Sequence, residues 1–182
     1  MSLQKTGVKT IVLMSLLGGA PAACHAIDSL SLELATGNRT QVARLGVQWD
    51  WQRQWRRSNG SHISGYWELN LSQWRARRFR GRPGNVEHIT EIGITPMFRL
   101  QRNNRLGPYL EAGIGAHLLS REYDNNGRRM SGQFQFGERL GAGYVFANRL
   151  DVSLNIQHFS NAGINHPNGG VNLAAMNFTY RF

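Results

Sequence analysis

Apolar side chains recur at every second position in eight separate segments of the chain. In the first segment, Leu30, Leu32 and Leu34 alternate with Ser, Glu and Ala residues. The other seven segments are 43–51, 63–71, 92–100, 110–118, 134–146, 150–156 and 176–182. A repeat of two is that of a β-strand whose faces lie in different surroundings, and no long stretch shows the 3.6-residue repeat of a helix. The pattern therefore predicts an all-β protein with eight strands.

An even number of strands, each of about ten residues, is typical of a small outer-membrane barrel, whose apolar face points outward to lipid. A soluble barrel also alternates, but its apolar face points inward. The polar face here carries charges of both signs, which suits a narrow interior of paired charges; they are Glu33, Glu68, Glu91, Glu111, Arg99 and Arg139. The apolar face carries aromatic residues near strand ends, as a membrane girdle does; they are Trp49, Trp51, Tyr144, Tyr180 and Phe182. We predict an eight-stranded antiparallel transmembrane β-barrel in a bacterial outer membrane.

The first 26 residues have the layout of a secretory signal peptide. Lys5 and Lys9 give a positively charged N-terminal region, residues 11–17 form a short apolar run, and Ala26 ends a small-residue cleavage site. The apolar run is too short to cross a membrane as a helix. We expect cleavage after Ala26, which leaves residues 27–182 as the barrel, without cysteine or disulfide. A lipoprotein that begins at Cys24 is the alternative.

The chain is strongly basic, with a formal net charge of +10 at pH 7. Its two lysines lie in the predicted signal peptide, so every basic residue of the barrel is Arg. The guanidinium group donates in a fork that fits phosphate. Because export argues against nucleic acid, the expected partners are anionic lipid headgroups or lipopolysaccharide phosphates. The alternative is that the Arg bias only reflects genome composition.

Barrel topology assigns an orientation to the loops. With both ends in the periplasm, the outer loops lie near 36–40, 75–86, 120–132 and 161–170, and the inner turns near 53–62, 101–107 and 147–149. The second and third outer loops are rich in arginine. Their candidate contacts to anionic sugar phosphates are Arg78, Arg80, Arg128 and Arg129. The alternative is that these arginines bridge lipopolysaccharide on any barrel of this class.

A His and a Ser two residues apart end the seventh predicted strand. His158 and Ser160 continue the register of its apolar residues, so both are expected to face lipid at the outer end of the barrel. An imidazole beside a hydroxyl is the minimum set for an activated oxygen nucleophile. The alternative is that both are interfacial polar residues without chemistry.

The C-terminal quarter carries a specific resemblance. His-x-Ser-Asn-Ala at 158–162, Pro-Asn-x-Gly at 167–170 and a last strand that ends in Phe182 together resemble the PagL family of outer-membrane lipid A 3-O-deacylases. The resemblance implies an eight-stranded barrel with a lipid-facing site. It implies hydrolysis of the ester-linked 3-hydroxyacyl chain of lipid A, with no metal and no cofactor. Ser160 would be the nucleophile, and His158 the general base and then the general acid.

The resemblance also implies the rest of the site. Asn161, through its backbone N–H, and Asn168 would be the oxyanion-hole donors, and Gly163, Gly169 and Gly170 would give the loop its backbone freedom. The family's Glu that orients the His falls on Asn172. An Asn can accept from the His Nδ1–H and fix the tautomer, but it supplies no negative charge. We therefore expect an active but slower enzyme, with an inactive homologue as the alternative.

Two other classes of function stay open at this point. One is a non-catalytic structural barrel, and the other is a different outer-membrane lipid hydrolase or acyltransferase. The remaining barrel histidines are expected to be loop or lumen residues, because none has metal-ligand spacing with another; they are His62, His88, His117 and His166. Lipid A is the expected substrate, and a homodimer is left open.

Overall fold

The computed structural model describes residues 26–182. Residues 1–25 of the predicted signal peptide lie outside the described part. All the elements assigned in residues 26–182 are strands. They are β1 (Ser29–Gly37), β2 (Thr40–Asp50), β3 (Trp55–Ser58), β4 (Ser61–Ala76), β5 (Glu87–Arg102), β6 (Gly107–Leu119), β7 (Tyr123–Asn125), β8 (Arg128–Met130), β9 (Phe134–Val145), β10 (Leu150–Ser160) and β11 (Val171–Arg181). In this part of the chain no helix is long and apolar enough to cross a membrane.

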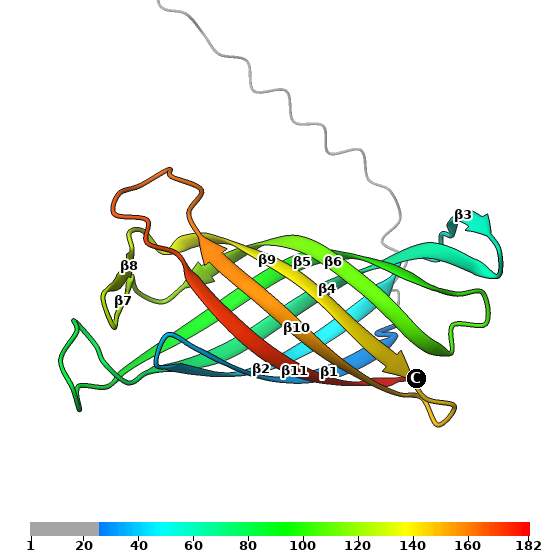
Figure 1. Ribbon diagram of the computed structural model, residues 1–182, viewed down its shortest axis with the longest axis horizontal. Coiled ribbons are helices and arrows are strands. Elements are labelled where there is room, and N and C mark those ends of the chain that lie inside the picture. The colour runs from blue at the N-terminus through cyan, green and yellow to red at the C-terminus, as the bar shows by residue number, and fades with distance from the viewer. Residues whose placement is uncertain (1–25) are drawn as a thin grey trace, which may run out of the picture.

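Eight of the strands close into an antiparallel barrel (Figure 1). The order is β2-β1-β11-β10-β9-β6-β5-β4, and pairing of β2 with β4 closes the ring. The short β3 extends the sheet at β4, and β7 and β8 form a separate hairpin within an outer loop. The first and last described residues lie together at the end of the barrel opposite that outer loop. There the Phe182 N–H donates to the Asp28 carbonyl at 2.9 Å. The predicted eight-stranded fold is confirmed.

Two strands are longer than the sequence predicted. β4 and β5 have 16 residues each, where we expected about ten. Their ladder continues past the apolar band at the outer end, where Arg75 pairs with His88 and Ala76 with Glu87. The expected length was wrong because alternation reports only the lipid-facing part of a strand, whereas backbone pairing continues as long as it satisfies N–H and C=O groups.

The alternating pattern places its apolar side chains outside. Leu45, Leu154 and Ile156 are more than 60% exposed on the outer wall of the barrel, while Arg44 beside Leu45 is 2% exposed. A continuous apolar wall of this kind is stable in lipid rather than in water. The wall therefore confirms that the apolar face points outward, as in a membrane barrel.

Paired charges fill the interior, as predicted. Arg44 bonds Glu33 and lies 3.6 Å from Glu91, while Arg139 lies 2.9 Å from Glu68. Nearer the other end, Arg99 lies 2.7 Å from both Glu111 and Asp151. Buried charges are tolerated when each has an opposite partner. These pairs tie together strands that are far apart in the sequence.

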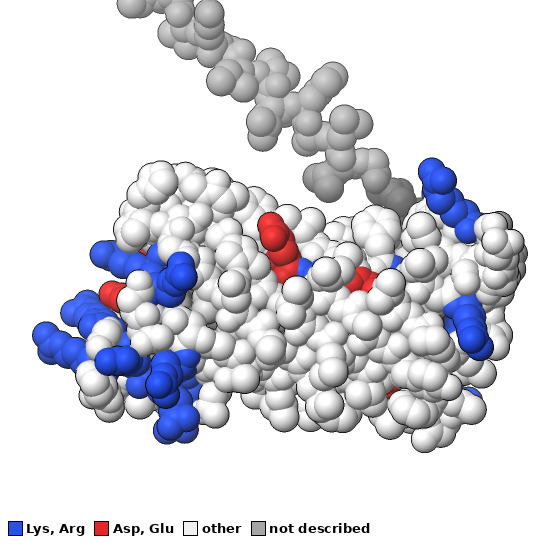
Figure 2. Space-filling view, viewed as in Figure 1, with Lys and Arg blue, Asp and Glu red and all other residues white. Residues whose placement is uncertain are grey.

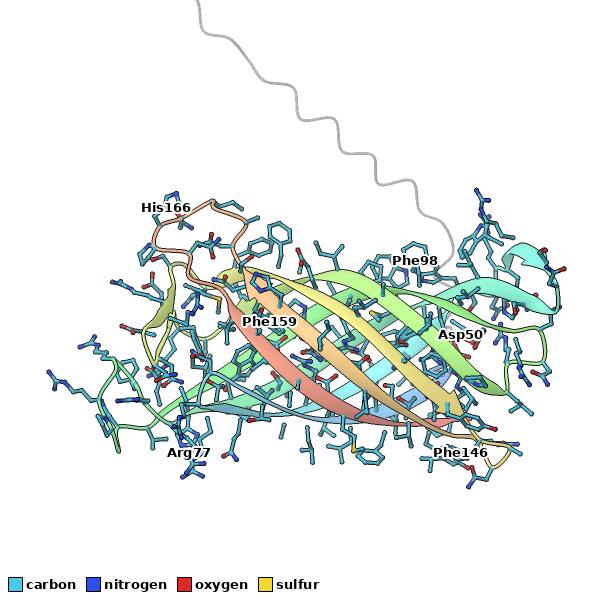
Figure 3. All side chains as sticks on the ribbon, viewed as in Figure 1. Asp50, Arg77, Phe98, Phe146, Phe159 and His166 are labelled. Carbon is cyan, nitrogen blue, oxygen red and sulfur yellow. The ribbon has the colours of Figure 1, made fainter. Side chains whose placement is uncertain are left out.

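An apolar cluster closes the outer end of the interior, and the sequence analysis did not predict it. Nine of its members are buried at inward-facing positions of barrel strands: Ala35, Val42, Trp74, Ile89, Leu119, Phe159, Val171, Leu173 and Ala175. The other two, Tyr123 and Met130, come from the β7–β8 hairpin. Trp74 and Phe159 meet edge to face, with ring centroids 4.9 Å apart. Phe159 points into the barrel from β10, as Figure 3 shows. The cluster thereby anchors the outer end of β10, where the candidate site lies.

Candidate active site

His158 and Ser160 lie at the outer end of β10, on the lipid-facing side. The residue between them, Phe159, is 2% exposed and points inward, so its two neighbours must point outward. Both outward side chains are half-buried. Among the hydrogen bonds of residues 26–182, none joins the Ser160 hydroxyl to the His158 ring. Such bonds are often long without substrate and tighten in the substrate complex.

Asn172 holds the ring of His158. The two residues are direct partners across β10 and β11, and His158 Nδ1 lies 2.6 Å from Asn172 Oδ1. With the amide oxygen as acceptor, the proton of the neutral ring sits on Nδ1. The lone pair of Nε2 is then free to accept a proton from a hydroxyl.

Gly170 contacts the other edge of the His158 ring. A Cβ at Gly170 would lie 2.7 Å from His158 Cε1 and 3.1 Å from Nε2. Gly170 also has a φ of +56°, in the left-handed region that favours glycine. Two independent requirements therefore call for glycine here: the backbone conformation and the space that the ring occupies.

The loop 161–170 is organised around the buried side chain of Asn161. Its amide Nδ2 donates to the carbonyls of Ser131 and Asn165, at 2.8 and 2.9 Å, and its Oδ1 accepts from the N–H of Gly163. The backbone N–H of Asn161, a predicted oxyanion-hole donor, donates to Asn168 Oδ1 at 3.1 Å. The two predicted donors therefore contact each other. Within residues 26–182 the Asn168 Nδ2 group has no hydrogen-bond partner.

The same loop docks on the β7–β8 hairpin. The Ser131 N–H donates to the Pro167 carbonyl at 2.9 Å, and the Gly169 N–H donates to the Arg129 carbonyl at 2.7 Å. Arg128 adds a side-chain bond, from Nη1 to the Gly169 carbonyl at 2.9 Å. Outer loops three and four thus form one unit that presses Gly170 against His158.

The four predicted substrate-binding arginines lie in the loop between β4 and β5 and on β8. Both segments belong to the outer end, where basic side chains gather in Figure 2. Arg78 donates to the Gly81 carbonyl within its own loop and to Asn126 Oδ1 in the third outer loop. Arg128 donates to the Gly169 carbonyl in the fourth outer loop. Arg80 lies over the ring of Phe79, and Arg129 pairs with Glu122 at 3.4 Å. No hydrogen bond or ion pair in residues 26–182 joins any of them to His158 or Ser160. The charges of Arg80 and Arg129 lie exposed where anionic headgroups would meet the loops.

A groove of about 510 Å³ runs down the outer wall from His158. Three polar side chains, those of Glu138, His158 and Asn172, line its outer end. Two residues closer to the middle of the barrel along each strand, the apolar Leu140, Ile156 and Ala174 are cross-strand partners and line the continuation. The arrangement suits a ligand with a polar junction at His158 and a hydrocarbon chain directed into the bilayer. The sequence analysis predicted neither the groove nor the place of Glu138 in it.

The other histidines lie elsewhere. His117 lies in the barrel interior, with Nδ1 2.5 Å from Glu91, and His62 is buried beside Asn103. His88 is exposed on β5, and His166 lies on the loop 161–170 (Figure 3). Residues 26–182 contain no group of three or more His, Cys, Asp or Glu side chains that could hold a metal ion.

Comparisons with known proteins agree on one family. The family model described as lipid A 3-O-deacylase (PagL) matches residues 41–181. The lipid A deacylase PagL of Pseudomonas aeruginosa is 32% identical over 163 residues, which cover 88% of this chain and 89% of that protein. The lipid A deacylase PagL of Bordetella bronchiseptica is 32% identical over 174 residues, or 94% and 93% of the two chains. The crystal structure of the outer membrane enzyme PagL has the same fold, with a TM-score of 0.73 at 24% identity over 85% of this chain and 99% of that one. The chain belongs to the lipid A 3-O-deacylase (PagL) family.

Proposed function

We propose that this protein is a serine esterase that removes the 3-hydroxyacyl chain from the 3-position of lipid A in the outer leaflet. One observation carries the proposal. The hydrogen bond from His158 to Asn172 lies on a lipid-facing surface, two residues from Ser160 and directly above an apolar groove. A His held in one tautomer beside a hydroxyl, within a lipid leaflet, is equipped for ester cleavage in a lipid.

The first half of the reaction forms an acyl-enzyme. His158 Nε2 takes the proton of Ser160 while Oγ attacks the ester carbonyl carbon. The carbonyl oxygen becomes negatively charged, and Asn168 Nδ2 donates to it. The bond from the carbonyl carbon to the sugar oxygen then breaks, and His158 returns its proton to that oxygen. The deacylated sugar leaves, and the acyl group stays on Ser160.

The second half releases the fatty acid. Water attacks the acyl-enzyme as His158 removes one of its protons. The bond to Oγ breaks, and His158 returns the proton to Ser160, so the products are a 3-hydroxy fatty acid and free enzyme. The hydrocarbon chain lies along Leu140, Ile156 and Ala174 during both halves. The phosphorylated sugars lie above it, near Arg80 and Arg129, which supply the charges that the headgroup needs.

Mass spectrometry of lipid A from cells that express the protein tests the proposal. We expect the loss of one ester-linked 3-hydroxyacyl chain with the parent and no loss with Ser160→Ala. Ser58→Ala, at the opposite end of the barrel, is the matched control and should deacylate normally. Unchanged lipid A with a folded parent protein would instead favour a structural barrel. A gained acyl chain would favour an acyltransferase, and free fatty acid from phospholipid would favour a phospholipase.

A further inference from the structure

Glu138 is a carboxylate on the lipid-facing wall of the barrel. It occupies an outward position of β9, between the exposed Phe134 and Leu140. Within residues 26–182 it is the one carboxylate of the barrel strands that is exposed rather than buried or half-buried, and it has neither an ion pair nor a hydrogen bond. The middle of the wall around it is almost free of charge (Figure 2). An ionisable side chain facing lipid is costly, so it points to a functional role with a nearby partner.

The register supplies that partner. Glu138 on β9 is the direct cross-strand partner of His158 on β10, and both line the same groove. Directly opposite residues have their Cβ atoms about 4.5–5.5 Å apart, within reach of long side chains. His158 therefore has Asn172 on one side and Glu138 on the other.

A negative charge at this point would speed the chemistry. When Ser160 gives up its proton, the His158 ring becomes a cation in surroundings that contain lipid. Asn172 orients the ring but is neutral, so it cannot stabilise that cation by charge. Three residues flank the His158 ring: Glu138 on β9, Asn172 on β11 and Gly170 on the loop, and of these only Glu138 carries a charge. Arg139, next to Glu138, points inward and pairs with Glu68.

We propose that Glu138 is a positioning residue that supplies, from β9, the negative charge that stabilises protonated His158. Two roles are thereby divided between two strands: Asn172 sets the tautomer of His158, and Glu138 stabilises its positive charge. The inference rests on the proposed esterase function of Ser160 and His158. It also gives a reason for a charged residue on the otherwise apolar outward face of β9.

The first test is Glu138→Gln, which removes the charge and keeps the shape. We expect kcat to fall about ten- to hundredfold, with KM little changed, because the interaction is made only with the cation of the transition state. Glu87→Gln, at the outer end of β5, is the matched control and should change neither quantity.

Rescue separates this role from a structural one. Asn172→Glu combined with Glu138→Gln returns a carboxylate to the opposite side of His158, and we expect kcat to recover to the parent value or above. Glu138→Asp should retain part of the activity. Migration of the unheated proteins on SDS gels verifies that each barrel is folded. If Glu138→Gln is folded and its kcat equals that of the parent, the inference is wrong. A loss of kcat that Asn172→Glu does not rescue also overturns it.

The outcomes of this test are separate from those of the proposed function. A folded Glu138→Gln that keeps the parent kcat contradicts the inference alone, even if the parent deacylates lipid A. A parent that leaves lipid A intact contradicts the proposed function, and the inference with it.

Discussion

The Nδ1 atom of His158 lies 2.6 Å from Oδ1 of Asn172 across two neighbouring strands, at the outer end of the lipid-facing wall. This bond sets which nitrogen of the ring is free to accept the Ser160 proton. Replacing the acceptor removes the tautomer control, which in serine proteases is worth several orders of magnitude.

We predict that Asn172→Ala lowers kcat for lipid A at least tenfold, because the ring then lacks the acceptor for its Nδ1–H. Asn172→Glu in the otherwise unchanged protein should raise kcat, since a carboxylate keeps the hydrogen bond and adds charge. Both are measured as initial rates of fatty acid release. If Asn172→Glu leaves the rate unchanged, the assigned place of Asn172 in the site is wrong.

Gly170→Ala should reduce kcat by at least tenfold, because the new Cβ would lie 2.7 Å from His158 Cε1 and would displace the ring. Gly163→Ala is the matched control. Gly163 also has a positive φ, of +80°, but no atom lies within 4 Å of its Cβ position. Both variants bear a similar backbone cost of about 1 kcal/mol, so only a ring displacement separates their rates. Equal rates in the two variants would contradict the contact.

Arg44→Met should lower the free energy of unfolding by about 3–5 kcal/mol, because it leaves buried Glu33 and Glu91 with too little positive charge. Urea unfolding in lipid vesicles, followed by tryptophan fluorescence, measures the change. Arg75→Met, at an exposed position of β4, is the control and should cost well under 1 kcal/mol. A similar loss in both variants would mean that the interior pairs do not stabilise the barrel.

Arg128 and Arg129 are adjacent, but their replacement should change different kinetic parameters. Arg128→Gln removes the bond to the Gly169 carbonyl, loosens the loop beside His158 and should lower kcat about two- to tenfold. Arg129→Gln removes an exposed charge and should mainly raise KM, about two- to fivefold, with weaker dependence on salt. Steady-state kinetics at two ionic strengths separate the two effects. If both variants change the same parameter, the separate roles assigned to Arg128 and Arg129 are wrong.

The barrel could be predicted from the sequence because the alternating pattern is a local property of each strand. The alternation of Leu30, Leu32 and Leu34 and of the later segments reports which side of each strand meets lipid, and no distant contact is needed to read it. The lipid-facing direction of His158 and Ser160 follows from the same parity. Strand ends were less well predicted, since β4 and β5 continue where the apolar pattern stops.

The composition of the site depended on contacts between segments far apart in the chain. The pairing of Glu138 with His158 depends on the register of β9 against β10, in which a shift of one residue would turn the carboxylate to the other face of the sheet. The contact of Gly170 with His158 and the use of Asn161 as the anchor of its loop depend on how two outer loops dock. By itself the sequence determined the strands, their faces and the His-x-Ser pair, because these follow from local periodicity and motif. Only the tertiary structure decided which charge and which backbone flank His158, because cross-strand register and loop docking are set by non-local pairing.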